Sequence, residues 1–348
     1  MTKIQCLAGA ATALLSVTTG VAYGATGTNL NGSGSTLSKP YQEVAIDQFK
    51  KTHKDIIINY GGGGSGKGRQ DLADMVVDFA GSDSPFKPAD AAKAKGGEIL
   101  YFPILLSPIA VSYNVSGVDK LQLSAPTIAK IFQSEIKKWN DPAIAADNPG
   151  AKLPDTAIVV AHRADGSGTT QNFTEYLAGA AKGVWKLKSG STVEWPSDTQ
   201  AGQGSAGVAQ IVKSTKGAIG YVDLSDAKAS GLKFAMIKNR SGKFIEPTAA
   251  AASAAGEGID VKENLLFSAL DAKGDKAYPI TAQTWVIVYA KQTDAAKGEA
   301  LKAYITFLVK DGQGLLTDID YAPLPKSLQD KALKQVDKIK VAARASLP

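Results

Sequence analysis

The chain has 348 residues, and its 39 Lys and Arg against 33 Asp and Glu give a formal net charge of +6. The basic residues are spread along the sequence, which argues against a dedicated nucleic-acid-binding protein. A single cysteine, Cys6, and only 2 histidines exclude internal disulfides and make a Cys- or His-based metal site unexpected. The length suits about two domains, and 44% hydrophobic with 21% charged residues is typical of a globular protein.

Residues 1–24 have the pattern of an export signal peptide. Lys3 precedes an apolar run from Leu7 to Val21, and small residues then indicate cleavage near Gly24/Ala25. The run is shorter than the ~20 residues of a membrane-spanning helix, so a retained membrane anchor is the weaker alternative. We therefore expect an exported mature protein.

The mature chain alternates short apolar runs with segments of helical periodicity, which predicts an α/β fold. In chain order, the pattern predicts a helix over 41–49, a buried strand at 56–58, a helix face through 72–76 and an apolar stretch at 78–80. It then predicts a strand at 158–160, a helix at 170–177, strands at 217–222 and 285–289, and helices at 300–309 and 328–336.

Two segments have a less regular pattern. The apolar stretch Ile99–Val115 contains Pro103 and Pro108, so it predicts short or broken strands. The alanine- and glycine-rich segment Thr248–Gly258 predicts a surface helix or loop of little specificity.

Glycine and hydroxyl residues collect in three loops, each after an apolar or extended stretch and before a helix. The loops are 32–37 (GSGSTL), 61–66 (GGGGSG) and 163–170 (RADGSGTT). Glycine lets backbone N–H groups approach an anion, Ser and Thr add hydroxyl donors, and the start of a helix directs its positive dipole end at the ligand. Three such units in one chain predict an oxyanion site.

Two charged residues define this site further. The Arg163 guanidinium can grip a tetrahedral oxyanion with two parallel bonds; alternatively it is a surface arginine paired with Asp165, and both can hold together. Asp83 lies at a turn, where its alternative role is to cap the turn or a helix. A carboxylate in an anion site favours a ligand that carries a proton, which phosphate does near neutral pH and sulfate does not. Asp83 is thus predicted to accept a phosphate proton and to reject sulfate.

Nucleotide and hydrolase motifs match poorly. Gly61, Gly63 and Gly66 fit a dinucleotide fingerprint, but a run of glycines satisfies that pattern trivially. The segment Gly61–Lys67 departs from a P-loop at Gly68, where a Ser or Thr would hold magnesium. The sequence has no nucleophile elbow at the serines of the three loops and no recognisable triad, so hydrolysis has no support from it.

Several motifs, in this order along the chain, resemble the periplasmic phosphate-binding proteins of the Pst ABC transporter. The specific part is the Arg163–Thr169 string (RADGSGT) together with Asp78–Asp83 (DFAGSD), and the similarity runs through essentially the whole mature chain. The other matching motifs are GSGSTL at 32–37, YG…SG at 60–66, KKWND at 137–141, GAIGY at 217–221 and DYAPLP at 320–325.

The resemblance implies a two-lobed, type 2 periplasmic-binding-protein fold with a hinged ligand cleft. Lobe I would comprise residues 25–109 plus 282–348 and lobe II residues 110–281, with crossings near 110–114 and 279–283. The phosphate-binding residues carried over by motif are Thr36, Leu37, Ser65, Asp83, Arg163, Ser167, Gly168 and Thr169. Leu37 stands where the family commonly has phenylalanine, and Lys67 in the second loop is atypical.

The resemblance further implies a monomeric periplasmic solute-binding protein that captures inorganic phosphate and delivers it to the membrane permease subunits of an ABC transporter. We expect no catalytic activity, no cofactor and no metal. An exported phosphatase, or a binder of another oxyanion or an organic phosphate on the same scaffold, are the alternatives.

Overall fold

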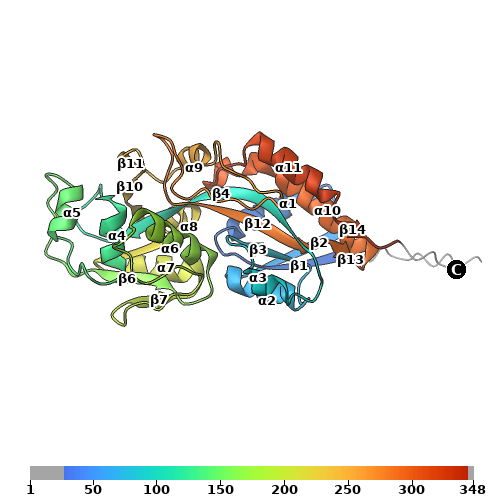
Figure 1. Ribbon diagram of the computed structural model, residues 1–348, viewed down its shortest axis with the longest axis horizontal. Helices are drawn as coiled ribbons and strands as arrows, with labels where there is room; N and C mark the ends of the chain where they lie inside the picture. Colours follow the sequence, from blue (N-terminus) through green and yellow to red (C-terminus); the bar gives the residue numbers. More distant parts are fainter. Residues whose placement is uncertain (1–26, 344–348) are drawn as a thin grey trace, which may run out of the picture.

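The computed structural model describes residues 27–343 (Figure 1). They form an α/β fold on a nine-stranded sheet in the order β2-β1-β3-β12-β4-β8-β6-β7, with β9 paired to β4. The predicted export signal, residues 1–24, lies outside the described residues. No helix between residues 27 and 343 is long and apolar enough to cross a membrane.

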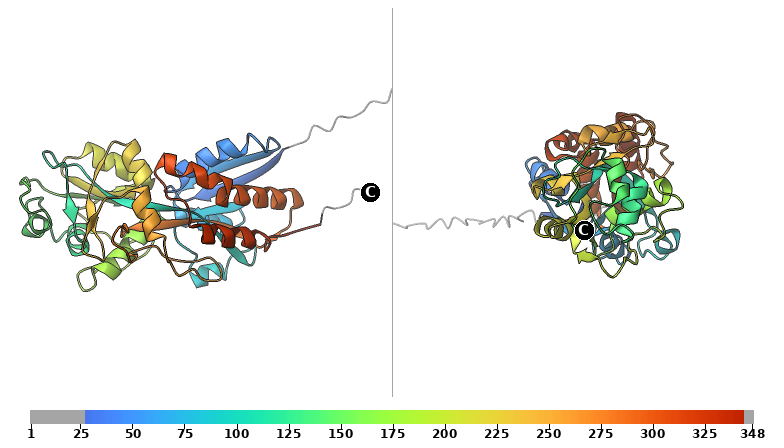
Figure 2. Two further views of the ribbon diagram at one scale, coloured as in Figure 1. Left: turned by 90° about the horizontal axis from the view of Figure 1, so that it is seen from above. Right: turned by 90° about the vertical axis from the view of Figure 1, so that its left-hand side faces the viewer.

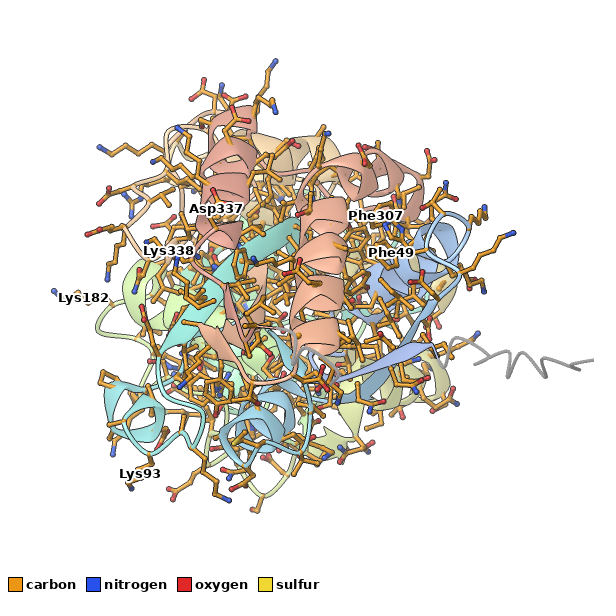
Figure 3. All side chains as sticks on the ribbon, turned by 90° about the vertical axis from the view of Figure 1, so that its right-hand side faces the viewer. Phe49, Lys93, Lys182, Phe307, Asp337 and Lys338 are labelled. Carbon is orange, nitrogen blue, oxygen red and sulfur yellow. The ribbon has the colours of Figure 1, made fainter. Side chains whose placement is uncertain are left out.

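The first lobe is the part of the molecule built on β1, β2, β3 and β12. Strands β2, β1 and β3 run parallel, and β12 lies antiparallel beside β3. Helices α1, α10 and α11 lie on one side of this part of the sheet and α2 and α3 on the other (Figures 1 and 2). Phe49 of α1 meets Phe307 of α10 edge to face, with ring centroids 5.5 Å apart (Figure 3). The bounds are β1 Thr28–Gly34, α1 Lys39–Phe49, β2 Ile56–Gly63, α2 Ser65–Ala73, β3 Phe79–Ser82, α3 Pro88–Ala91, β12 Thr281–Tyr289, α10 Ala295–Val309 and α11 Lys326–Val336.

The second lobe is the part built on β6, β7 and β8, which run parallel to one another. Its core includes Phe132, Phe173 and Tyr221, whose rings pack together between α4, α6 and β8. The bounds here are β5 Gln122–Leu123, α4 Ala125–Phe132, α5 Pro142–Asp147, β6 Val159–Arg163, α6 Gly168–Ala180, β7 Gln200–Gly202, α7 Gly204–Ser214, β8 Ala218–Asp223 and α8 Leu224–Ala229. The remaining elements are β9 Lys233–Phe234, β10 Met236–Lys238, β11 Phe244–Ile245, α9 Ala249–Ala255, β13 Lys291–Gln292, η1 Asp311–Leu315, η2 Thr317–Ile319 and β14 Lys340–Val341.

One long strand, β4 (Ile99–Tyr113), connects the two lobes, and the prediction of short or broken strands here is wrong. Residues 99–108 pair with β12 and residues 109–113 with β8 (Figure 1). Pro103 and Pro108 are tolerated because, in the described chain, residues 99–108 have a strand partner, β12, on one edge only. On the other edge, the strand pairing of the described residues is limited to an isolated bridge between Leu106 and Ala322. A proline on such an open edge removes no ladder hydrogen bond.

Three local predictions also need correction. Helix α2 ends at Ala73, so Met75 and Val76 are not on its buried face but are 57% and 69% exposed. The chain turns away at Met75, whose φ of 62° is left-handed. Strand β2 is the sheet edge rather than a buried strand, and Ile57 is 51% exposed. The segment Thr248–Gly258, predicted as a surface helix or loop of little specificity, does contain a helix, α9, but this helix buries three of its alanines and packs against β4.

Candidate functional site

Asp83 lies at the centre of the predicted site. It directly follows β3 and is 1% exposed. Ser35 Oγ and Thr284 Oγ1 donate hydrogen bonds to its Oδ1 at 2.6 and 2.7 Å, and Ser65 Oγ donates to its Oδ2 at 3.2 Å. A buried carboxylate needs such donors because it has lost its water. The carboxyl group is therefore fixed in orientation, with two hydroxyls on one oxygen and one on the other.

The electrostatic environment of Asp83 combines opposing effects. Burial has the largest effect and raises the pKa of the Asp83 carboxyl overall, although the hydrogen bonds from Ser35, Thr284 and Ser65 and the positive charge of Arg163 oppose it. Each hydroxyl donor stabilises the ionised form, in which the carboxylate is an acceptor only. The raised pKa makes the Asp83 carboxylate a better proton acceptor, and the hydroxyl donors limit how readily it becomes protonated.

Arg69 of α2 braces the turn that carries Asp83. Its Nη1 donates to Ser82 Oγ at 2.8 Å, to Ser84 Oγ at 2.7 Å and to the Ser84 carbonyl at 3.2 Å. Burial lowers the pKa of the Arg69 guanidinium, and the negative charge of Asp83 raises it. Arg69 therefore fixes the residues on both sides of Asp83.

The first predicted loop leaves β1 and enters α1 beside Asp83. Its backbone is held by the Ser35 N–H, which donates to the Gly81 carbonyl at 2.8 Å. The Tyr321 hydroxyl donates to the Leu37 carbonyl at 2.7 Å, and the Leu37 side chain lies in the core. Thr36 Oγ1 lies 3.0 Å from Ser205 Oγ of the second lobe. A groove of about 360 Å³ opens beside this contact.

The second predicted loop places Ser65 at the first turn of α2. The Asp83 N–H donates to Ser65 Oγ at 3.1 Å, so Ser65 contacts both the backbone and the carboxyl group of Asp83. Gly64 precedes it with φ of 91°, and a Cβ there would lie 2.2 Å from Asp165 Oδ2 and 2.7 Å from the Gly166 carbonyl. Only glycine suits this conformation and this close approach. The loop is thus packed against the third loop from the other lobe.

The third predicted loop carries Arg163 at the end of β6. Its Nε donates to Asp165 Oδ1 at 2.8 Å and its Nη2 to Asp165 Oδ2, and both side chains are almost completely buried. The Gly204 N–H also donates to Asp165 at 2.9 Å. Burial raises the pKa of Asp165, but the hydrogen bonds and charge of Arg163 outweigh it and the pKa is lowered overall. The predicted Arg163–Asp165 pair is therefore present, and it is buried rather than on the surface.

The start of α6 faces Asp83 from the second lobe. Ser167 is the N-cap, and its Oγ accepts a hydrogen bond from the Thr170 N–H at 3.1 Å. A Cβ on Gly168 would lie 2.4 Å from Ser65 Oγ and 2.8 Å from Asp83 Oδ2. The hydroxyl of Thr169 is buried without a hydrogen-bond partner among the described residues. A helix N-terminus supplies backbone N–H donors and a positive dipole end.

The two lobes are hydrogen-bonded to each other around Asp83. The Gly66 N–H donates to the Gly166 carbonyl at 2.7 Å, and Asn172 Nδ2 of α6 donates to the Asp83 carbonyl at 2.7 Å. Gln283 Nε2 of β12 in turn donates to Asn172 Oδ1 at 2.9 Å. The structure is therefore a closed arrangement, in which residues far apart in sequence converge.

The structure brings all of the predicted binding residues to this junction between the lobes; they are Thr36, Leu37, Ser65, Asp83, Arg163, Ser167, Gly168 and Thr169. Lys67 points elsewhere, because it is 56% exposed and pairs with Asp71. Sequence reasoning missed Ser35, Arg69, Asn172 and Thr284 as neighbours of Asp83. The predicted strand at 285–289 begins one residue after Thr284 and so did not include it. Between residues 27 and 343, no group of three or more His, Cys, Asp or Glu could hold a metal ion.

The model of the PBP superfamily domain matches residues 19–311 of the chain. Phosphate-binding protein PstS of Pasteurella multocida is 35% identical over 316 residues, covering 88% of this chain and 89% of that protein. PstS of Methanocaldococcus jannaschii is 37% identical over 306 residues, covering 81% and 78%. PstS of Xylella fastidiosa strain Temecula1 is 35% identical over 286 residues, covering 80% and 76%.

Solved structures have the same fold. A high-affinity periplasmic phosphate-binding protein, PfluDING, bound with phosphate, superposes with a TM-score of 0.75 at 21% identity, covering 88% of this chain and 94% of that chain. A phosphate-binding protein from Stenotrophomonas maltophilia gives a TM-score of 0.67 at 20% identity, covering 88% and 94%. The predicted two-lobed α/β fold is confirmed. With a superfamily model matching most of its length and relatives above 30% identity, the chain belongs to the PstS family of phosphate-binding proteins.

Proposed function

We propose that this chain is an extracytoplasmic solute-binding protein that holds inorganic phosphate between its two lobes. The observation that carries the proposal is the buried Asp83 carboxylate facing the start of α6. A ligand there must bring a proton to Asp83 and offer oxygens to the surrounding donors. Phosphate does both near neutral pH, since its second ionisation lies at about pKa 6–7. Relatives named phosphate-binding protein PstS support the same ligand.

The proposed roles follow from the donors at the junction. Thr36 and Leu37 give backbone N–H groups, and the Thr36 and Ser65 hydroxyls add to them. Arg163 supplies the charged clamp, oriented by its buried bonds to Asp165. From the second lobe, Ser167, Gly168 and Thr169 present the N-terminus of α6. The Thr169 hydroxyl, which has no partner in the described part of the chain, is available to a ligand oxygen.

The arrangement also supports delivery to a transporter. Donors from both lobes make the ligand favour the closed state, and closure is a signal that a permease can recognise. The proposed lobes are residues 25–109 plus 282–348 and residues 110–281, supported by the change of strand partner in β4 between Pro108 and Ile109. We propose a monomer, exported to the periplasm after cleavage near Gly24/Ala25, whose partners are the permease subunits of a phosphate ABC transporter.

Binding without catalysis is the simpler interpretation of this chemistry. Ser167 Oγ accepts a backbone N–H at the start of α6, and among the described residues no hydrogen bond joins it to a histidine. His162 Nδ1 bonds to the Arg163 carbonyl, and its ring stacks on Trp195. Turnover of p-nitrophenyl phosphate by the pure protein, abolished by Ser167→Ala, would instead establish the phosphatase alternative.

Calorimetry with phosphate and sulfate tests the proposal. We expect tight one-to-one binding of phosphate and no heat with equimolar sulfate, and an at least ~100-fold smaller preference for phosphate in Asp83→Asn. Asp147→Asn is the matched control, because Asp147 also accepts hydroxyl hydrogen bonds but lies beside α4, away from Asp83. Equal affinity for the two ions in the wild-type protein would refute the role of Asp83, and competition with organic phosphates tests the remaining alternative.

A further inference from the structure

Thr284 lies on β12, outside the three loops that carry the predicted binding residues. It is fully buried, and the hydrogen bond from its hydroxyl to Asp83 Oδ1, at 2.7 Å, is the single side-chain bond that the described structure gives it. Its partner in β4 is Leu105, and the pairing register shifts between Thr284 and Trp285. The extra residue at this shift is Ile104 of β4, whereas on the other side of β12 the pairing of Trp285 with Ser82 brings Thr284 beside Asp83.

The distribution of donors on the Asp83 carboxyl group is unequal. Oδ1 accepts short bonds from Ser35 and Thr284, whereas Oδ2 accepts one longer bond from Ser65 and faces Gly168 at the start of α6. Together with Ser35, Thr284 therefore occupies Oδ1, the oxygen that is bonded within the protein. The other oxygen is left as the acceptor for a ligand.

We infer that Thr284 is a positioning and specificity-determining residue, whose hydroxyl keeps Asp83 a proton acceptor and so excludes fully ionised oxyanions. This inference rests on the proposed phosphate function. Without the hydroxyl, the buried Asp83 would take up a proton more readily. A protonated Asp83 is a donor, and a donor can bind sulfate as well as phosphate. The discrimination between the two ions would then weaken.

Other charged and titratable groups face Asp83 and act on it in known directions. Arg163 from β6 and Arg69 from α2 are cationic neighbours that favour the ionised carboxylate. Tyr60 from β2 stays neutral, since burial raises the pKa of its hydroxyl and the charge of Asp83 raises it further. None of these three groups is changed by a substitution at position 284. The pH dependence of sulfate binding therefore reports on Asp83 itself.

The test compares wild type, Thr284→Val and Thr284→Ser by calorimetry with phosphate and with sulfate between pH 5 and 8.5. For Thr284→Val we expect phosphate affinity at pH 8 to fall about 10-fold, as for a lost bond to a charged group. We also expect sulfate binding to begin at a pH about one unit higher than in the wild-type protein, which corresponds to a tenfold change in the proton affinity of Asp83. Thr284→Ser, which keeps the hydroxyl, should restore both values.

Thr127→Val is the matched control, because it removes a threonine bond to another carboxylate, Asp147, at 2.6 Å. This substitution should change neither the affinity for phosphate nor the pH profile of sulfate binding. Should Thr284→Val fail to fold, Ser35→Ala removes the other Oδ1 donor and must shift the sulfate profile in the same direction. A Thr284→Val protein with an unchanged sulfate profile overturns the inference, whether or not phosphate affinity falls. A wild-type protein that binds no phosphate overturns the proposed function instead.

Discussion

Replacing Gly168 by alanine tests whether the lobes must close as tightly as the structure shows. A Cβ at this position would lie 2.4 Å from Ser65 Oγ, 2.7 Å from Asp83 Cβ and 2.8 Å from Asp83 Oδ2. Non-bonded heavy atoms are most favourable at ~3.5–4.0 Å, so the methyl group would hold the start of α6 about 1 Å too far from Asp83. Ser65 and Asp83 cannot move aside, because they are buried and bonded to each other.

The expected result is a loss of phosphate affinity of at least ~100-fold, or about 2.7 kcal/mol. The fold of the ligand-free protein should not suffer. Gly168 is not among the glycines with positive φ, so alanine fits its backbone. In the wild-type protein, phosphate at about 1,000 times its Kd should add about 4.1 kcal/mol to the free energy of unfolding. The variant should lose most of this ligand-dependent gain.

Calorimetry gives the affinity, and thermal melts with and without phosphate give the stabilisation. Gly179→Ala is the control, since Gly179 lies in the same helix and a Cβ there would meet nothing within 4 Å. Phosphate binding to Gly168→Ala at wild-type affinity would refute the closed geometry as the binding state. A lower melting temperature of Gly168→Ala without phosphate would show instead that the loss of affinity comes from damage to the fold.

Two further predictions concern charged residues near the junction. Arg163→Lys keeps the charge but loses the fork that holds Asp165, so calorimetry should give an affinity about 10- to 100-fold weaker; wild-type affinity would remove the need for a guanidinium. Burial raises the pKa of Asp223 well above its usual value, so the folded state binds this proton more tightly than the unfolded state does. The associated stability is present at low pH and is lost as pH rises through the raised pKa. Asp223→Asn, which imitates the neutral form, should therefore raise the melting temperature at pH 8 more than at pH 4, and an equal change at both would contradict the ionisation argument.

The loops of the site could be predicted because their signal is local. Each combines glycine, hydroxyl residues and the start of a helix within a few positions, and the structure places all three between the lobes. Thr284 could not be found this way. It is 201 residues from Asp83 in sequence, and a threonine in a strand is ordinary. Only the antiparallel pairing of β12 with β3 brings the two together.

The wrong predictions about the fold also arise because the local sequence does not encode contacts with distant segments. The helical periodicity of Met75 and Val76 continues beyond Ala73, but the left-handed backbone at Met75 ends the helix pattern, and neither residue is buried. Pro103 and Pro108 predict breaks only if both edges of their strand are paired. In this sheet one edge is largely open, which the local sequence does not encode.

The charges at the junction suggest where affinity comes from. Arg163 is already paired with Asp165, whose carboxyl pKa is lowered overall, and an ionised Asp83 then leaves these three side chains with a negative sum. A phosphate dianion is therefore not drawn in by an excess of positive side chains. Besides the guanidinium of Arg163, its binding must come from hydroxyl and backbone N–H dipoles held in place by the two lobes, which act at short range in a dry site. Because such dipoles are fixed and buried, added salt should weaken phosphate affinity far less than it weakens binding at an exposed basic patch.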